Sequence, residues 1–433
     1  QIIVGLRTSM AFGLRALVGA EMIAGTSGLG FMTIDASQSY GTDTVIVGML
    51  VIAVVWYVLD RAVFIPLERK TVVRWGLQRF QKMVRVAVVG TGWYSCVNHL
   101  PALKAIPGVE IAGICDTDPD RLATVSENFG VAFATRDFRM LAALGADAAI
   151  VASANDAHAE QTRAFLEAGA HVLVEKPMTL SAAEAWRLVA AARLCKRELL
   201  VAYGWNYKPH FAMAMELLRQ EEIGPIESVV AHQGSPVRRI FTGDLGEGRW
   251  SGALVEPRPE TWRNAGRGGG FTFGQLSHLL GFVFGLLPLD TVSVSAVMHG
   301  TRAGLDRGVM AHASFRGGAV ASLSGVAGVP EQDDNYCNII FYGGRGSMVV
   351  DTRLDHISVG SHRGASRRIS LPRGCGRYDC IGPVDALIAI ARGESRNLSD
   401  GAAGARAVQT IEAMHSSARA GGSRIDLSDV QMQ

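Results

Sequence analysis

Short apolar runs alternate with stretches of mixed polarity along residues 84–205 of the chain. The apolar runs are rich in β-branched and small residues, as buried parallel strands are, and the stretches between them fit helices. This spacing predicts an α/β domain with a doubly wound parallel sheet. The expected strands cover 86–89, 109–115, 148–153, 171–174 and 198–203, and two expected helices cover 157–168 and 181–194.

The pattern changes after residue 205, where runs typical of β-strands follow one another with few helical stretches between them. They predict a second, α+β domain over 206–433 that is built on one large, open, mostly antiparallel sheet. A helix is expected near 402–419. The expected strands cover 226–233, 291–298, 308–315, 319–326, 336–342 and 346–351.

Residues 1–82 differ from everything after them. The stretch 44–59 carries no charged side chain, and the apolar run resumes after Asp60 and Arg61. We expect two transmembrane helices, at about 2–24 and 44–65, and the basic residues that follow, up to Lys82, place that flank on the cytoplasmic side. The alternative is a buried core segment. The sequence from Met83 onward resembles the start of a separate soluble protein. We therefore expect two units to be joined near Lys82.

Composition narrows the classes of function. The net charge of +2 argues against a nucleic-acid-binding surface, and a hydrophobic fraction of 48% is high for a fully soluble protein. The six cysteines form no CxxC pair and show no zinc-ligand spacing. We therefore expect no metal site, and free thiols that suit a reducing cytoplasm.

The loop after the first expected strand has the spacing of a phosphate-binding turn. Gly90 permits a tight turn, and Gly92 lets the backbone approach a pyrophosphate at the start of the helix near Ser95. Asp116 ends the next strand, where a carboxylate can accept hydrogen bonds from the adenosine ribose and disfavours a 2′-phosphate, although Arg121 softens this preference for NAD. The alternative role for Asp116 is a helix cap.

Two further strand ends carry polar residues. Ser153, Asn155 and His158 follow the strand at 148–153, with helix capping as the alternative for Asn155 and a structural role as the alternative for His158. Lys176 follows the strand at 171–174, where its ammonium group can orient a hydroxyl group or share its proton during hydride transfer; the alternative is a surface lysine before a turn.

One histidine in the second domain is a candidate acid or base. His278 follows a triple glycine at 268–270, and Gln275 shares its helical face. An imidazole suits the oxidation of an alcohol to a ketone, although a histidine among leucines is more often a core residue.

Together these motifs resemble the Gfo/Idh/MocA family of oxidoreductases over about Val84 to Leu427. The resemblance rests on the Gly90 loop with His99–Leu103, on Cys115–Pro119, on Ala152–His158, on Glu175–Pro177, and on Trp262–Arg263 before the triple glycine and His278. It implies NAD, or NADP, and a sugar, polyol or cyclitol substrate. It also implies a homo-oligomer that associates through the second sheet.

The resemblance assigns roles to individual residues. Lys176 and His278 become the catalytic pair. The family often has aspartate where Gly274 stands, so the proton relay would rest on these two residues or on Tyr207. The implied cofactor-binding residues are Gly90, Thr91, Gly92, Trp93, Tyr94, Asp116, Arg121, Ser153, Asn155, His158, Glu175 and Lys176, and the implied substrate-binding residues are Tyr207, Trp262, Arg263 and Gln275.

Residues 1–82 resemble the last two helices of an ABC importer permease of the nitrate, sulfonate and taurine type. The resemblance rests on Gly5–Arg7, Ala20–Ala24, Ser27–Gly30, Asp35–Ala36 and Thr42–Ile52. It implies transporter subunits as partners and a location at the inner membrane, with the catalytic part in the cytoplasm; without this fusion the whole chain would be cytoplasmic. Two alternatives to an oxidoreductase stay open: a permease subunit with a cytosolic nucleotide sensor, and a non-catalytic nucleotide-binding homologue.

Overall fold

The computed structural model describes residues 10, 13, 16–39, 42–64, 82–242, 252–258, 260–300 and 304–427. The chain separates into two compact units, Gln1–Gln81 and Lys82–Gln433, and each is described by itself.

The first unit is helical. A helix over Ala16–Ala24 is followed by α2 (Leu29–Gln38) and α3 (Thr42–Leu59), which continues into a π-helical turn at Asp60–Phe64. Among the described residues, no single helix has both the length and the apolar character to cross a bilayer; one pair, Ala16–Ala24 with Leu29–Gln38, passes on length and composition but bends by 48°. Much of the expected span at 2–24 lies outside the described residues, and the expected span at 44–65 corresponds to α3 and the turn that continues it. The basic flank lies outside the described residues apart from Lys82.

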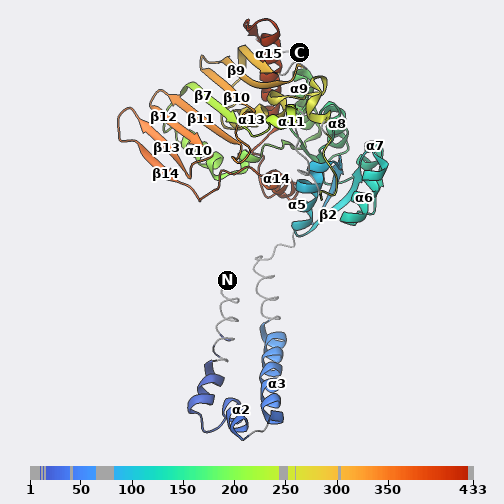
Figure 1. Ribbon diagram of the computed structural model, residues 1–433, viewed down its shortest axis with the longest axis vertical. Helices are drawn as coiled ribbons and strands as arrows, with labels where there is room; N and C mark the ends of the chain where they lie inside the picture. Colours follow the sequence, from blue (N-terminus) through green and yellow to red (C-terminus); the bar gives the residue numbers. More distant parts are fainter. Residues whose placement is uncertain are drawn as a thin grey trace. The chain divides into compact units, whose positions relative to one another are not determined.

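The first sheet confirms the predicted doubly wound domain (Figure 1). Its six strands pair in parallel in the order β3-β2-β1-β4-β5-β6. The order reverses between β1 and β4, which opens a crevice at the carboxyl ends of the strands. The strands are β1 (Val84–Val89), β2 (Val109–Cys115), β3 (Ala134–Thr135), β4 (Ala148–Val151), β5 (His171–Val174) and β6 (Leu199–Val201), with helices α5 (Leu100–Ala105), α6 (Pro119–Phe129), α7 (Phe138–Ala142), α8 (His158–Glu167) and α9 (Ala182–Cys195).

The second sheet is open and mostly antiparallel, as predicted, with β10 and β7 as a parallel pair. Buried and exposed positions alternate along β10 and β11, because one face packs on a core and the other does not. Its nine strands, in the order β14-β13-β12-β11-β7-β10-β9-β8-β15, are β7 (Ile226–Gly234), β8 (Thr291–Gly300), β9 (Asp306–Phe315), β10 (Val320–Val326), β11 (Tyr336–Gly343), β12 (Gly346–Asp351), β13 (His356–Ser361), β14 (Arg367–Ser370) and β15 (Ile425–Asp426).

Helices pack against both sheets and contribute side chains to their cores. Side chains of α10 (Pro209–Arg219), α13 (Ser277–Leu286) and α15 (Gly401–Arg419) share one buried cluster with the inner face of the second sheet. A late helix, α14 (Ile381–Ala391), instead packs its fully buried Val384 and Leu387 into the core of the first sheet. The sequence pattern gave no sign of this return.

Candidate active site

The loop after β1 contacts the ends of both neighbouring strands, β2 and β4. Gly90 has a φ of +89°, and a Cβ there would overlap the carbonyl group of Ala152 at the end of β4. Its N–H donates to Cys115 O at 2.8 Å, and Ser95 Oγ donates to Gly90 O at 2.5 Å. At Gly92 a Cβ would meet no atom within 4 Å. The loop is therefore rigid at its first glycine and open at its second.

Asp116 is buried at the end of β2 and organises this loop. Its Oδ2 accepts hydrogen bonds from the backbone N–H and the hydroxyl of Thr91, both at 2.9 Å, and from Arg121 Nη1 at 3.3 Å. Its Oδ1 accepts the N–H of Asp118 at 3.0 Å. Asp118, not Asp116, caps α6. Asp116 thus links the loop to the start of the next helix.

The polar residues after β4 make contacts both within the first domain and with the second. Ser153 Oγ donates to Gln161 Oε1 at 2.5 Å, and Asn155 Nδ2 donates to Arg267 O of the second domain at 3.1 Å. His158 is buried, with Nδ1 2.9 Å from Pro177 O and Nε2 3.2 Å from Ser153 O. His158 therefore joins the β4 and β5 loops, which is a structural contact.

Glu175 and His99 form a buried pair beneath the loop. Their Oε1 and Nε2 atoms are 3.0 Å apart, and Glu175 Oε2 accepts the N–H of Lys176 at 3.1 Å. Burial by itself would raise the pKa of the Glu175 carboxyl, but the bond with His99 and the charge of Lys176 outweigh it, so the pKa is lowered. The carboxylate stays ionised beside Lys176.

Lys176 bridges the two domains. Its Nζ donates to Gly274 O, 2.7 Å away, in a π-helical turn at Thr272–Leu276. Such turns occur frequently at functional sites. Burial lowers the pKa of Lys176, against the opposing charge of Glu175. A Cβ at Gly274 would meet nothing within 4 Å, and Gly274 lines the same pocket as Lys176.

His278 lies one turn further along, in α13. Its ring meets Tyr378, Trp205 and Tyr203 edge-on, with centroid distances of 4.8, 5.8 and 6.4 Å. Its Nδ1 is buried and has no hydrogen-bond partner among the residues described. Burial, and then the charge of Lys176, lower the pKa of His278 well below its usual range. The ring is therefore neutral near pH 7.

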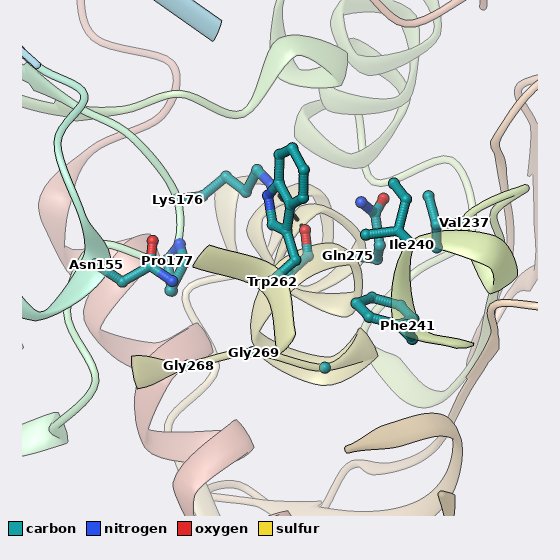
Figure 2. Close-up of a pocket in the computed structure, with 12 residues that line it drawn as sticks. Asn155, Lys176, Pro177, Val237, Ile240, Phe241, Trp262, Gly268, Gly269 and Gln275 are labelled. Carbon is teal, nitrogen blue, oxygen red and sulfur yellow. Dashed lines mark hydrogen bonds between the residues drawn. The ribbon is translucent and has the colours of Figure 1, made fainter. Parts of the chain in front are cut away.

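A pocket with an empty volume of about 440 Å³ lies between the two sheets (Figure 2). Of the predicted site residues it brings together Asn155, Lys176, Trp262 and Gln275. His278 is not in its lining. The lining consists of Asn155, Lys176, Pro177, Val237, Ile240, Phe241, Trp262, Gly268, Gly269, Gly270, Gly274 and Gln275.

Two predicted substrate residues lie elsewhere. The Tyr207 hydroxyl is 2.7 Å from Ser399 Oγ, and burial raises the pKa of Tyr207 to about 12, so it is a poor proton relay. Arg263 Nε donates to Ile240 O at 2.9 Å and thereby holds the backbone of the pocket wall. Neither residue lines the pocket.

Sequence reasoning missed the partners of Tyr94. Its hydroxyl is 2.6 Å from Cys380 Sγ, just before α14, and Tyr378 of the same segment packs on His278. Burial raises the pKa of Cys380 to about 11, so this thiol is un-ionised. No local signal marks these residues, because they lie almost 300 positions after the loop that they support. The apolar wall did have a signal: Val237, Ile240 and Phe241 have helical spacing.

These residues fit a dinucleotide. A glycine whose Cβ would overlap the backbone, a second glycine facing open space, and a helix N-terminus follow one another at the reversal of strand order. The Gly90–Tyr94 loop, which Asp116 holds in place, would bind its adenosine and pyrophosphate part. The rings of Trp93 and Tyr94, at the end of this loop, have centroids 6.0 Å apart.

Comparisons with known proteins agree with this geometry. D-apiose dehydrogenase of Paraburkholderia graminis is 31% identical over 144 residues, 33% of this chain and 38% of that protein. 1,5-anhydro-D-fructose reductase of Ensifer adhaerens is 27% identical over 257 residues, 58% of this chain and 68% of that protein. The chain thus spans 38% of the D-apiose dehydrogenase, and it spans 47% of inositol 2-dehydrogenase 3 of Saccharopolyspora erythraea.

The fold extends further than the sequence similarity. A structure of levoglucosan dehydrogenase in complex with NADH superposes with a TM-score of 0.62 at 21% identity, over 79% of this chain and 98% of that one. Residues 84–203 match the model of the oxidoreductase family with an NAD-binding Rossmann fold, and residues 211–349 match the GFO/IDH/MocA C-terminal domain. Over these two regions, which together make up more than half of its length, the chain belongs to the Gfo/Idh/MocA family of oxidoreductases.

Proposed function

We propose that this protein is an NAD-dependent oxidoreductase that interconverts a hydroxyl group and a carbonyl group on a sugar, polyol or cyclitol. The observation that carries the proposal is the position of Lys176. Lys176 follows β5 at the same edge of the first sheet as the Gly90 loop, it lines the pocket, and its Nζ is fixed on Gly274 O at 2.7 Å.

The chemistry divides between the cofactor and the chain. Bound NAD would supply the nicotinamide carbon that takes the hydride. Lys176 would orient the substrate hydroxyl group by donating a hydrogen bond to its oxygen, and neutral His278 would take the hydroxyl proton, directly or through one water. Glu175, ionised and paired with His99, would keep Lys176 charged in a buried place.

The relatives support this class of substrate. Their names describe dehydrogenases and reductases of apiose, inositol and anhydrofructose. The proposal is tested with the full chain by titrating NADH and NADPH separately and then screening sugars and cyclitols for reduced-nicotinamide absorbance. If neither nucleotide binds, the proposal is refuted. Binding without any turnover would favour the non-catalytic alternative.

The pH dependence of oxidation tests the role of His278. Because its pKa is lowered, the ring is neutral and able to accept a proton at and above about pH 6.5, so kcat/KM should stay level down to that pH and fall only below it. His278→Gln should lower kcat by about 10²-fold and abolish that acid limb. His362→Gln, at an exposed site, is the control. An unchanged pH profile in His278→Gln would remove His278 from the mechanism.

The same histidine affects stability with a definite sign. Below about pH 6.5 the unfolded chain binds a proton that the folded His278 does not, so the unfolded state gains stability as the pH falls. The contribution of this group to folding stability is therefore present above that pH and is lost below it.

We further propose that residues 1–82 form a membrane-associated, permease-like segment. Support comes from α3, whose Met49, Leu50 and Val54 are exposed within its own unit. Carbonate extraction of cell membranes should leave the full chain in the pellet and release an 83–433 fragment. Release of both would contradict the membrane proposal, and with it a role beside transporter subunits.

Association of copies through the second sheet is also proposed. Val297, Met310 and Val320 expose 60%, 71% and 50% of their surface on its outer face. Light scattering after size exclusion should report a dimer or a larger assembly, whereas a monomer would contradict it.

A further inference from the structure

The lining of the pocket divides into a polar and an apolar part. Lys176 and Asn155 lie on one side, and Val237, Ile240 and Phe241 lie on the other (Figure 2). In this view Trp262 stands between them, and the Gln275 amide lies between Trp262 and Ile240. Apart from the indole N–H of Trp262, the side chains of the apolar wall carry no hydrogen-bonding group.

The polar groups of the pocket are few and already oriented. Asn155 Nδ2 donates to Arg267 O at 3.1 Å, and Lys176 Nζ donates to Gly274 O at 2.7 Å. Gln275 Oε1 accepts from Ser235 Oγ at 3.3 Å, which leaves its NH₂ group to donate into the pocket. A substrate oxygen can therefore be recognised at Lys176 and at Gln275, near the reacting carbon.

The apolar wall is fixed in place. Ile240 and Phe241 belong to α11 (Arg238–Thr242), and Trp262 belongs to α12 (Glu260–Arg263). Arg263 Nε, on α12, donates to Ile240 O on α11 at 2.9 Å, and Phe241 is buried in the core of the second domain. The wall therefore meets a ligand as a preformed surface.

A fully hydroxylated sugar fits such a wall poorly. A hydroxyl group pressed against Val237 and Ile240 loses its hydrogen bonds to water and receives none from these two side chains. A methyl group at the same place is released from water at a gain. An apolar wall rejects an added hydroxyl group only moderately, by about 10²-fold at most, so a preference of about tenfold is expected.

From this division we infer that the substrate is a deoxysugar, in which a methyl group replaces a hydroxymethyl group and lies against Val237 and Ile240. The inference rests on the proposed function, since it assigns the reacting hydroxyl group to Lys176. If the inference holds, Val237 and Ile240 determine substrate specificity. Fully hydroxylated cyclitols are then poor ligands.

Matched sugar pairs test the inference on the full chain saturated with NADH. D-fucose is compared with D-galactose, and L-rhamnose with L-mannose, by calorimetric titration; myo-inositol is a third type of ligand. In at least one pair the deoxysugar should bind about tenfold more tightly than its hydroxylated partner, and more tightly than myo-inositol. Equal or tighter binding of the hydroxylated sugars, or no binding of any sugar, would overturn the inference.

A pair of variants shows whether the wall is responsible. Val237→Thr keeps the shape of the side chain and adds a hydroxyl group, so it should cut the tenfold preference to about threefold or less. Val230→Thr, on the outer face of the second sheet, should leave the preference unchanged. An unchanged ratio in Val237→Thr would contradict the assignment. Loss of NADH binding would instead refute the proposed function, so the two failures are distinguishable.

Discussion

Lys176→Met is expected to lower kcat/KM by about 10³-fold while NADH binding changes little. Methionine matches the length of the lysine side chain and removes both its charge and its donors. The substrate hydroxyl group then loses its hydrogen bond at the reacting centre, and Gly274 O loses its 2.7 Å partner. The measurement is steady-state kinetics beside an NADH titration.

The same change moves a second observable. The charge of Lys176 helps to lower the pKa of His278, so its removal should raise that pKa and move the acid limb of any residual activity to higher pH. Lys104→Met, on the exposed side of α5, is the matched control and should change neither kcat/KM nor the pH profile. Full activity in Lys176→Met would exclude this residue from the reaction.

Gly90→Ala and Gly92→Ala should fail in different ways. Alanine at position 90 must adopt a φ of +89° and overlap the carbonyl of Ala152, so the free energy of unfolding should fall by about 2–4 kcal/mol. At position 92 the added methyl group meets no protein atom within 4 Å, and stability should be unchanged. If the pyrophosphate lies against this loop, Gly92→Ala should still raise the Kd for NADH by about tenfold or more.

Thermal unfolding without nucleotide and an NADH titration separate the two effects. A stable Gly90→Ala protein would show that the loop is less constrained than its geometry indicates. An unchanged Kd in Gly92→Ala would place the pyrophosphate elsewhere.

Local pattern was sufficient for most of the fold. The strands at 109–115 and 171–174 have the predicted bounds, because apolar β-branched runs between turn residues encode buried strands directly. The return of α14 to the first sheet was not predictable, since an apolar helix does not specify which sheet it covers. In the first unit, the absence of charge over 44–59 predicted a span; α3 covers these residues, although no single described helix has both the length and the apolar character to cross a bilayer.

The site, like the fold, was predictable where local sequence pattern determines it and not where distant segments meet. Lys176, Gln275 and Trp262 were expected near the substrate, and the pocket lining includes all three. The contacts that hold the site, such as Tyr94 with Cys380 and Arg263 with Ile240, join segments far apart in the sequence and depend on the packing of two domains. The spacing of residues along the chain therefore does not predict such pairs.

Transfer of deuterium from a sugar to NAD⁺ tests the central claim most directly. The full chain is incubated with NAD⁺ and sugars, D-fucose and L-rhamnose among them, that carry deuterium at their carbinol carbons, and the nicotinamide product is analysed by mass spectrometry. Singly deuterated NADH is expected in amounts equal to the oxidised sugar, formed about 10³-fold more slowly with Lys176→Met. Reduced nicotinamide without deuterium, or no reduced nicotinamide with any sugar, would contradict it.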